Sequence, residues 1–435
     1  MNLPISDYSK VYGKVMDFNL NKTERVHRWF PFVEGYSVEF INSVLSEQET
    51  DNIICLDPFC GSGTTPLEMQ LRNIECYSIE VNPFLHLLST VKMNNTYSRN
   101  ELCREIDKLS NISHEEIEKI PPSLDMFAEK KFIVDNGLVD KWNFDFDAFS
   151  AFNDLHKIIN NIIDQPYRNL FNIVYASLLV PLSNLYRNGK CLSYKANWKD
   201  KQRVSYQDVF TAFMAHIHDN IIPDVEDIEL GKHGRSTMTN KDRCFLGDSR
   251  NLLDKSVPNR SVNLVITSPP YLNSRDYTDI YILELWMLGF AKAQRDIYDL
   301  RRKTLRSHVQ VNWGKSENLQ VTELSNVIKQ IELHRPNFWN PNLIEMIQGY
   351  FVDIRDLLRS MKNKLSDRSK IYLNIANSAY YGNVIHVDEI CAELAEREGY
   401  RCTDIRTARW LKSSGQQKLS VSKLKESVIV LEYNK

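Results

Sequence analysis

The chain has 435 residues, 43% of them hydrophobic and 25% charged, which is ordinary for a soluble globular protein and too apolar for a disordered one. Lys and Arg number 54 against 56 Asp and Glu, for a formal net charge of −2. This excludes a histone-like polycation, so an anionic partner must be bound by local basic patches. At about 150 residues per domain, the length predicts two or three domains.

No motif indicates a metal centre or a membrane span. The eight cysteines form no CxxC pair and are expected to be reduced, mostly buried thiols. The ten histidines form no ligand cluster beyond the isolated His216 and His218. The N-terminus lacks the apolar core of a secretory signal, and the most apolar stretch, residues 171–186, is too short to cross a bilayer. We expect a cytoplasmic protein without a bound metal.

The first structured unit begins with an apolar run at residues 52–56, which predicts a buried strand. A glycine-rich turn and a helix-like stretch follow, and a second predicted strand at residues 75–79 ends at Glu80. Strand, glycine turn, helix and acid-tipped strand are typical of a parallel α/β sheet that binds a nucleotide-like ligand.

The pattern then changes to amphipathic helices. Apolar residues recur at helical spacing in residues 101–112 and 148–165. The stretch is too long for an α/β crossover, so we interpret residues 91–240 as a helical insertion. Further strands are predicted at residues 243–246, 262–266, 371–375 and 427–431.

A second insertion is expected at residues 291–344, which are polar, rich in Arg and Asn, and weakly periodic. This segment is a candidate for target recognition. The catalytic domain would then combine residues 1–90, 241–290 and 345–435.

The glycine-rich turn runs from Asp57 to Thr65, as DPFCGSGTT. Gly61 and Gly63 allow the backbone to approach a ligand where helix N–H groups point outward. Glu80 follows Gly63 by 17 residues, near the spacing at which a carboxylate binds ribose hydroxyls. A tight turn is the alternative. Because the run lacks the GK[ST] of a P-loop and a third glycine, a nucleoside cofactor other than ATP or NAD is favoured.

A second motif, Thr267 to Tyr271 (TSPPY), follows the strand at residues 262–266. Consecutive prolines leave no backbone donors, so the loop offers carbonyls and the Ser268 hydroxyl. Acceptors beside an aromatic ring suit a planar amino group. The alternatives are a turn that ends a strand or a polyproline-type ligand. A third motif, Gly247-Asp248-Ser249-Arg250, is either a helix N-cap or a cofactor contact.

Together, DPFCGSGTT, the acid-tipped strand, GDSR and TSPPY resemble the S-adenosylmethionine-dependent DNA amino-methyltransferases. The form TSPPY is most similar to the N4-cytosine branch, because the N6-adenine branch more often carries Asp in place of Ser. Residues 25–37 loosely resemble the family's extra cofactor-pocket motif. The resemblance covers about half the chain and implies a class I, Rossmann-like methyltransferase sheet with a long helical insertion.

The resemblance also implies roles for individual residues. The residues that shape the methionine end of the S-adenosylmethionine site would be Asp57, Phe59, Gly61 and Gly63. Glu80 would bind the ribose hydroxyls and Asp248 the adenine amino group. The target-base pocket would be formed by Ser268, Pro269, Pro270 and Tyr271. The long segment between Asn82-Pro83 and Gly247-Asp248 departs from the family pattern, so the resemblance assigns no recognition role by position.

The implied activity is site-specific methylation of cytosine N4 in double-stranded DNA, as the modification enzyme of a restriction–modification pair. A cognate endonuclease acting on the same site would be the partner. C5-cytosine chemistry is excluded because the chain has no Pro-Cys dipeptide. The alternatives are N6-adenine methylation, guanine-N2 methylation of RNA, and a non-catalytic DNA-binding subunit.

Phosphate contacts are expected from basic clusters, because the whole chain is near neutral. The clusters lie at residues 187–203, 295–306 and 401–425. A solvated helical face is the alternative for each. The stretch from Ser183 to Lys190 is expected either to reach the active-site cleft or to end a helix.

Overall fold

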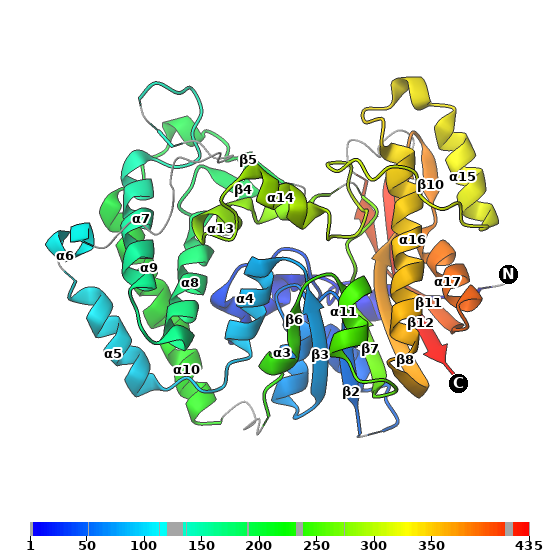
Figure 1. Cartoon of the computed structure of the whole chain (residues 1–435), viewed down its shortest axis with the longest axis horizontal. Helices are drawn as coiled ribbons and strands as arrows, with labels where there is room; N and C mark the ends of the chain where they lie inside the picture. Colours follow the sequence, from blue (N-terminus) through cyan, green and yellow to red (C-terminus); the bar gives the residue numbers. More distant parts are fainter. Residues whose placement is uncertain are drawn as a thin grey trace.

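The computed structural model describes residues 3–50, 52–112, 114–119, 134–135, 137–188, 191–231, 238–273, 275–413 and 421–434. Its centre is an eight-stranded sheet in the order β1-β11-β12-β8-β7-β2-β3-β6 (Figure 1). The strands are β1 (Ile5–Asp7), β2 (Ile54–Asp57), β3 (Glu75–Glu80), β6 (Cys244–Leu246), β7 (Val262–Thr267), β8 (Leu365–Ala376), β11 (Arg401–Lys412) and β12 (Lys423–Tyr433). Among them, β12 alone runs antiparallel to its neighbours.

The strand order places a switch point at the middle of the sheet. From β2 the chain moves outward through β3 to β6, and then returns to the other side of β2 for β7 and β8. In such sheets a ligand binds outside the carboxyl ends of the strands where the direction reverses, here β2 and β7. The Rossmann-like methyltransferase fold predicted from the sequence is confirmed, and β11 is the long strand that the sequence did not predict.

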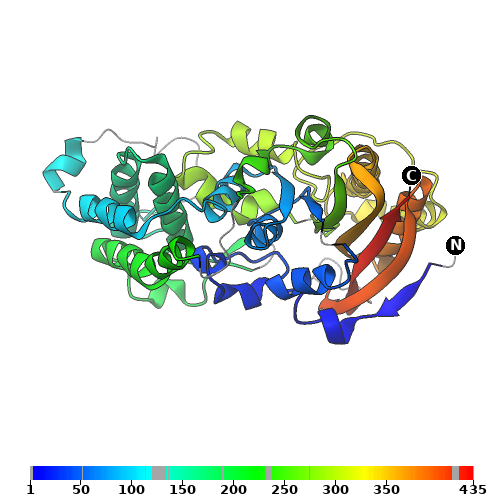
Figure 2. The same cartoon turned by 90° about the horizontal axis from the view of Figure 1, so that it is seen from below.

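Helices cover both faces of the sheet (Figure 2). Strand residues alternate between the faces, as the period of two requires. Leu56, Ile79 and Leu373 pack in one apolar cluster with α11 (Ser249–Ser256), α16 (Leu343–Lys362) and α17 (Val387–Arg397). Cys55, Cys76 and Tyr372 pack on the other face with α1 (Ser9–Tyr12), α2 (Val38–Leu45) and α3 (Thr64–Leu71).

A helical region lies beside the β6 end of the sheet, beyond α4 (Pro83–Lys92) (Figure 1). Its helices are α5 (Arg99–Ser110), α6 (His114–Lys119), α7 (Phe146–Asn160), α8 (Gln165–Leu179), α9 (Tyr206–His216), the π-helical η4 (Ile217–Ile221) and α10 (Ile222–Glu229). It also contains the hairpin of β4 (Leu185–Arg187) and β5 (Leu192–Tyr194). The helices share one apolar core with α4, because residues such as Phe171 and Leu88 belong to the same buried cluster.

The remaining elements are short or lie near the C-terminal half of the sheet. The helices are α12 (Tyr277–Ile280), α13 (Ile282–Met287), α14 (Gln294–Arg301) and α15 (Thr322–Glu332). The strands β9 (Ser378–Tyr380) and β10 (Asn383–Ile385) form a second hairpin. Single 3₁₀ turns are η1 (Phe18–Lys22), η2 (His27–Trp29), η3 (Trp198–Asp200), η5 (Lys241–Arg243) and η6 (Arg335–Asn337).

The cysteines are as the sequence predicted: all eight are free thiols, and only Cys103 and Cys191 are not buried. Within the described ranges, no helix combines the length and apolarity needed to cross a membrane.

Candidate functional site

The two strands at the switch point are joined by a side-chain hydrogen bond. Thr267, at the end of β7, donates to Asp57 Oδ1 at the end of β2 over 2.7 Å, and the Phe59 N–H donates to the same oxygen over 3.1 Å. Burial raises the pKa of Asp57 to about 6, although these hydrogen bonds oppose the shift. Asp57 therefore shapes the turn from within and presents Phe59 to the space outside the strand ends.

The glycines of the turn are required by space and backbone angle. Gly61 and Gly63 have φ of +53° and +81°, in the left-handed region that favours glycine. A Cβ on Gly63 would lie 3.0 Å from Ser89 on α4, and one on Gly61 would lie 3.2 Å from the Phe32 ring. The turn is thus packed tightly against α4 and the N-terminal segment.

A cavity of about 420 Å³ lies outside these strand ends, within the size range of small-molecule sites. Of the ten residues predicted for the site, eight line it: Phe59, Gly61, Glu80, Asp248, Ser268, Pro269, Pro270 and Tyr271. Asp57 and Gly63 lie behind the turn rather than on the cavity lining. The structure therefore brings the three motifs, which are far apart in the sequence, to one space.

Glu80 holds two loops at the cavity wall. Its carboxylate accepts the Gly61 N–H and the Asn82 N–H, each over 2.8 Å. Burial raises the pKa of Glu80 to about 7, against the effect of both hydrogen bonds. Each carboxylate oxygen retains a second acceptor position, so the residue can still accept from a ligand hydroxyl.

Asp248 has the N-cap role that the sequence left open. It accepts the Arg250 N–H over 3.0 Å at the start of α11 and forms an ion pair with the Arg250 guanidinium. Because Asp248 also lines the cavity, the N-cap and a ligand contact are compatible.

The loop after β7 is anchored by hydrogen bonds from other strands. Tyr271 donates its hydroxyl to Glu426 Oε1 over 2.6 Å and accepts from Asn374 Nδ2 over 2.7 Å. Asn374 Nδ2 also lies 3.5 Å from the Ser268 hydroxyl. Burial and the charge of Glu426 raise the pKa of Tyr271 well above its usual value, so the phenol stays protonated.

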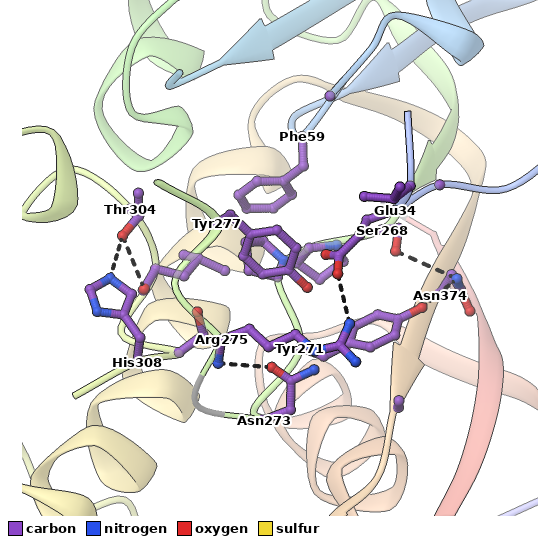
Figure 3. Close-up of a pocket in the computed structure, with 18 of the residues that line it drawn as sticks. Glu34, Phe59, Ser268, Tyr271, Asn273, Arg275, Tyr277, Thr304, His308 and Asn374 are labelled. Atoms are coloured by element: carbon purple, nitrogen blue, oxygen red, sulfur yellow. Dashed lines mark hydrogen bonds and ion pairs between the residues drawn. The ribbon is translucent and has the colours of Figure 1, made fainter. Parts of the chain in front are cut away.

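Several lining residues were not found from the sequence. Figure 3 shows Glu34, Tyr277 and Arg275 around the same space as Phe59, Tyr271 and Asn374. Arg275 donates to Glu34 over 2.7 Å, and burial raises the pKa of Glu34 to about 7. Glu34 lies in the segment 25–37 that resembled a cofactor motif, which was the available signal. Asn374 lies in a strand that was predicted, without its role.

Buried polar atoms on the lining test whether the cavity suits a polar ligand. Among the described residues, six lining side chains each leave a buried atom without a hydrogen-bond partner: Glu34 Oε2, Arg275 Nε, Tyr281 Oη, Ser307 Oγ, His308 Nδ1 and Asn374 Oδ1. Unpaired buried polar atoms are rare in proteins. Donors and acceptors mixed with apolar rings fit a nucleoside cofactor and a planar base, and carboxylates at Glu34 and Glu80 fit a cationic sulfonium group.

The N-terminal wall of the cavity is held by the helical region. Asp224 on α10 is 1% exposed, and its carboxylate accepts from the Val26 N–H (2.8 Å), from Arg28 (2.7 Å) and from the Trp29 indole (2.8 Å). A few residues later, the Phe32 ring stacks on Tyr281, with centroids 5.9 Å apart. Both rings line the cavity.

Arg187 on the β4–β5 hairpin supports the same wall from behind. Its guanidinium lies over the rings of Phe30 and Tyr281, at 5.5 and 5.2 Å from the centroids, and pairs with buried Glu284. The stretch from Ser183 thus packs on the wall and does not line the cavity; its last residues, Gly189 and Lys190, lie outside the described residues.

The basic clusters are partly neutralised inside the protein. Arginines of all three clusters form ion pairs with carboxylates: Arg187 with Glu284, Arg301 with Asp276, Arg306 with Asp353, Arg406 with Glu47 and Arg409 with Glu426. The segment 401–425 proves to be mostly the strands β11 and β12, and its Lys418 lies outside the described residues. Lys412 and Lys423 face each other at the end of this hairpin and are exposed.

One group of side chains at the N-terminus of α17 has the spacing of metal ligands. His386, Asp388 and Glu389 bring ligand atoms within 4.8 Å of one another. Asp388 is already bonded to Ser427 (2.7 Å) and paired with Lys425 (2.9 Å). None of the three residues lines the cavity among the described residues.

The strand order and the cavity at the switch point define an α/β protein with a methyltransferase fold. No family model matches the chain. It is 23% identical over 460 residues to the Type II methyltransferase M.BsoBI of Geobacillus stearothermophilus, covering 93% of this chain and 84% of that protein. It is 25% identical over 434 residues to the Type II methyltransferase M.AvaI of Nostoc sp., covering 93% and 85%.

A solved structure, the rRNA methyltransferase aviRa from Streptomyces viridochromogenes, aligns with 94% of this chain and 84% of its own at 12% identity. Its TM-score is 0.26, so the fold is assigned from the strand order alone.

Proposed function

We propose that the protein is a site-specific DNA methyltransferase that transfers a methyl group from S-adenosylmethionine to N4 of cytosine. The observation that carries the proposal is the meeting of Phe59, Gly61 and Glu80 with the Ser268–Tyr271 loop around one cavity. Similarity over 93% of the chain to proteins named Type II methyltransferases supports methyl transfer. The modification role in a restriction–modification pair, with a cognate endonuclease, is part of the proposal.

The cofactor would be held at the β2 end of the cavity. Glu80 would accept from the ribose hydroxyls, Asp248 from the adenine amino group, and the turn from Asp57 to Gly63 would enclose the methionine part. When bound, S-adenosylmethionine supplies an electrophilic methyl group on a sulfonium sulfur. The carboxylates that line the cavity, Glu34 and Glu80, would stabilise this positive charge.

The target amine would be held by the loop after β7. The Ser268 hydroxyl and the Pro269 carbonyl would accept its two hydrogens, which draws lone-pair density out of conjugation with the ring. Pro269 and Pro270 have no N–H groups that would compete. Because the base must leave the duplex to enter this cavity, stacking on Tyr271 would offset part of the cost. Direct transfer of this kind requires no covalent intermediate.

The test is expression in a host without DNA methylation of its own, followed by single-molecule sequencing. We expect N4-methylcytosine in one short motif. N6-methyladenine would retain the mechanism and change the base. A Ser268→Ala variant, shown to be folded by its cofactor-induced thermal shift, is the matched control. Absence of any DNA mark from a cofactor-binding wild-type protein would contradict the proposal and favour an RNA substrate, whereas absence of cofactor binding would favour the non-catalytic subunit.

A further inference from the structure

The Tyr271 hydroxyl is held by side chains from two neighbouring strands, β8 and β12, although Tyr271 itself belongs to a loop. It donates to Glu426 on β12 over 2.6 Å and accepts from Asn374 on β8 over 2.7 Å. The ring of Tyr271 faces the cavity, and Figure 3 shows it beside Asn374 and Ser268. The far end of the ring is therefore held at a fixed point relative to the sheet.

Glu426 itself is a buried charge, with 1% of its surface exposed. Arg409 on β11 pairs with its second oxygen, and Asn374 donates to the first over 3.3 Å. The strand register explains the meeting, because Glu426 lies opposite Ala376 on β8 and Arg409 on β11. A buried carboxylate is costly unless it is fully paired, and here its partners include the hydroxyl of Tyr271, which belongs to the proposed base pocket.

Within the loop itself, the Ser268 side chain is a further hydrogen-bond partner of the Tyr271 hydroxyl. Pro269 and Pro270 contribute no backbone donors, and a tyrosine ring that is unrestrained at its hydroxyl can rotate about both side-chain torsions. Methyl transfer needs the amine aligned with the sulfonium, and displacements of about 1 Å lower rates strongly.

We propose that Glu426 is a positioning residue that fixes the Tyr271 ring as the stacking platform for the extruded base. The inference rests on the proposed function, because it assumes that a base enters this cavity. Glu426 need not touch the base; it acts through the Tyr271 hydroxyl. Asn374 completes the anchor, because its Nδ2 donates both to the Tyr271 hydroxyl and to Glu426 Oε1.

The experiment is a double-mutant cycle of Glu426→Ala and Tyr271→Phe. It uses saturating cofactor and an unmethylated duplex that carries the motif identified by sequencing. Glu432→Ala is the matched control, because Glu432 lies on the same strand and pairs with exposed Arg401 at the surface. We expect each cavity variant to lower kcat by about ten- to a hundredfold. The affinity for S-adenosylmethionine should change little in all variants.

The decisive result is the double variant. If Glu426 acts through the Tyr271 hydroxyl, adding Glu426→Ala to Tyr271→Phe lowers kcat little further. The inference would be overturned if the losses in kcat of the two single variants multiplied in the double variant. It would also be overturned if the single variants had wild-type kcat. If Glu426→Ala does not fold, Tyr271→Phe decides alone, since it leaves the Glu426–Arg409 pair in place, and an unchanged kcat would refute the anchor. A wild-type protein that methylates no DNA would instead refute the proposed function.

Discussion

The carboxyl edge of the sheet and the helical region contribute to the cavity in different ways. The lining residues come from strand ends, from the N-terminal segment, from loops that follow the strands, from α12 and from residues 300–308. None that the structure describes lies between Leu85 and Asp248. The helical region contributes Asp224 and Arg187, which hold the wall without lining it. The sheet edge therefore carries the candidate chemistry, while the helical region sets the shape of the space.

The largest expected effect tests the contribution of the sheet edge. Ser268→Ala removes one acceptor of the target amine and should lower kcat by about 10²- to 10³-fold. The affinity for S-adenosylmethionine should not change, because Ser268 is assigned to the base. Steady-state methylation of the mapped motif and calorimetric titration of the cofactor measure both quantities. Wild-type kcat would show that the loop does not hold the amine.

The next effect tests the support from the helical region. Asp224→Ala leaves Arg28, the Trp29 indole and the Val26 N–H without their buried acceptor, which should lower the free energy of unfolding by about 3 kcal/mol. Cofactor affinity should fall as well, because the same segment continues to Phe32 and Glu34. Chemical denaturation and cofactor titration at a temperature where the variant is folded measure these effects.

Glu226→Ala is the control on the same helix, since Glu226 is 49% exposed in a surface pair with Arg99, and surface pairs contribute little. If Asp224→Ala retained full cofactor affinity, the helical region would stabilise the fold without shaping the cavity.

A smaller effect is expected from pH. Burial raises the pKa of Glu34 and Glu80 to about 7 and that of Asp57 to about 6. Without cofactor, these three carboxyl groups raise the free energy of unfolding below pH 4, where they are protonated. This contribution is lost as pH rises towards 7, because burial in the folded state disfavours their ionisation. A cationic cofactor favours the ionised carboxylates, so its affinity should rise from pH 6 to 8 by about tenfold for each of Glu34 and Glu80 and by about twofold for Asp57.

Calorimetric titration across this range measures the slope, and Glu80→Gln should flatten it while weakening binding overall. An affinity of the wild-type protein that is independent of pH would contradict the assignment of these carboxylates to the cofactor.

The smallest effect concerns DNA contact at the rim. Lys412→Ala with Lys423→Ala should weaken duplex binding severalfold and reduce the salt dependence by about two counterions. Lys255→Ala is the control, because Lys255 is exposed near the end of α11, at the opposite edge of the sheet. Binding titrations at several salt concentrations measure the slope. Equal slopes for the variant and the wild type would place the DNA elsewhere.

The sequence predicts the strands whose residues are continuously apolar and the motifs that follow them. The strands β2, β3 and β7 and the loops after them are local features, because burial on both faces leaves a pattern in neighbouring residues. The same reasoning fails for β11, whose sequence RCTDIRTARWLK was interpreted as part of a basic cluster for phosphate contacts, with a solvated helical face as the alternative. Its Arg406 and Arg409 are accommodated by Glu47 and Glu426, which are distant in sequence.

The residues that the sequence did not identify share this dependence on distant partners. The sequence around Asn374, Glu426 and Asp224 gives no indication of their roles. Each acts through a hydrogen bond to a residue more than 50 positions away in the sequence. Pairings of this kind become visible only when the strand order is known, which is why the site's motifs were predicted and its anchors were not.

The position of β12 has a consequence for synthesis of the protein. In sequence this strand follows both β8 and β11, yet it lies between them inside the sheet. A nascent chain on the ribosome has neither Glu426 nor a closed sheet until residues 423–433 have been added, so β8 and β11 can be joined only after β12 has been made. A premature stop codon just before residue 423 should likewise give an inactive protein with two unpaired strand edges, which are prone to aggregate.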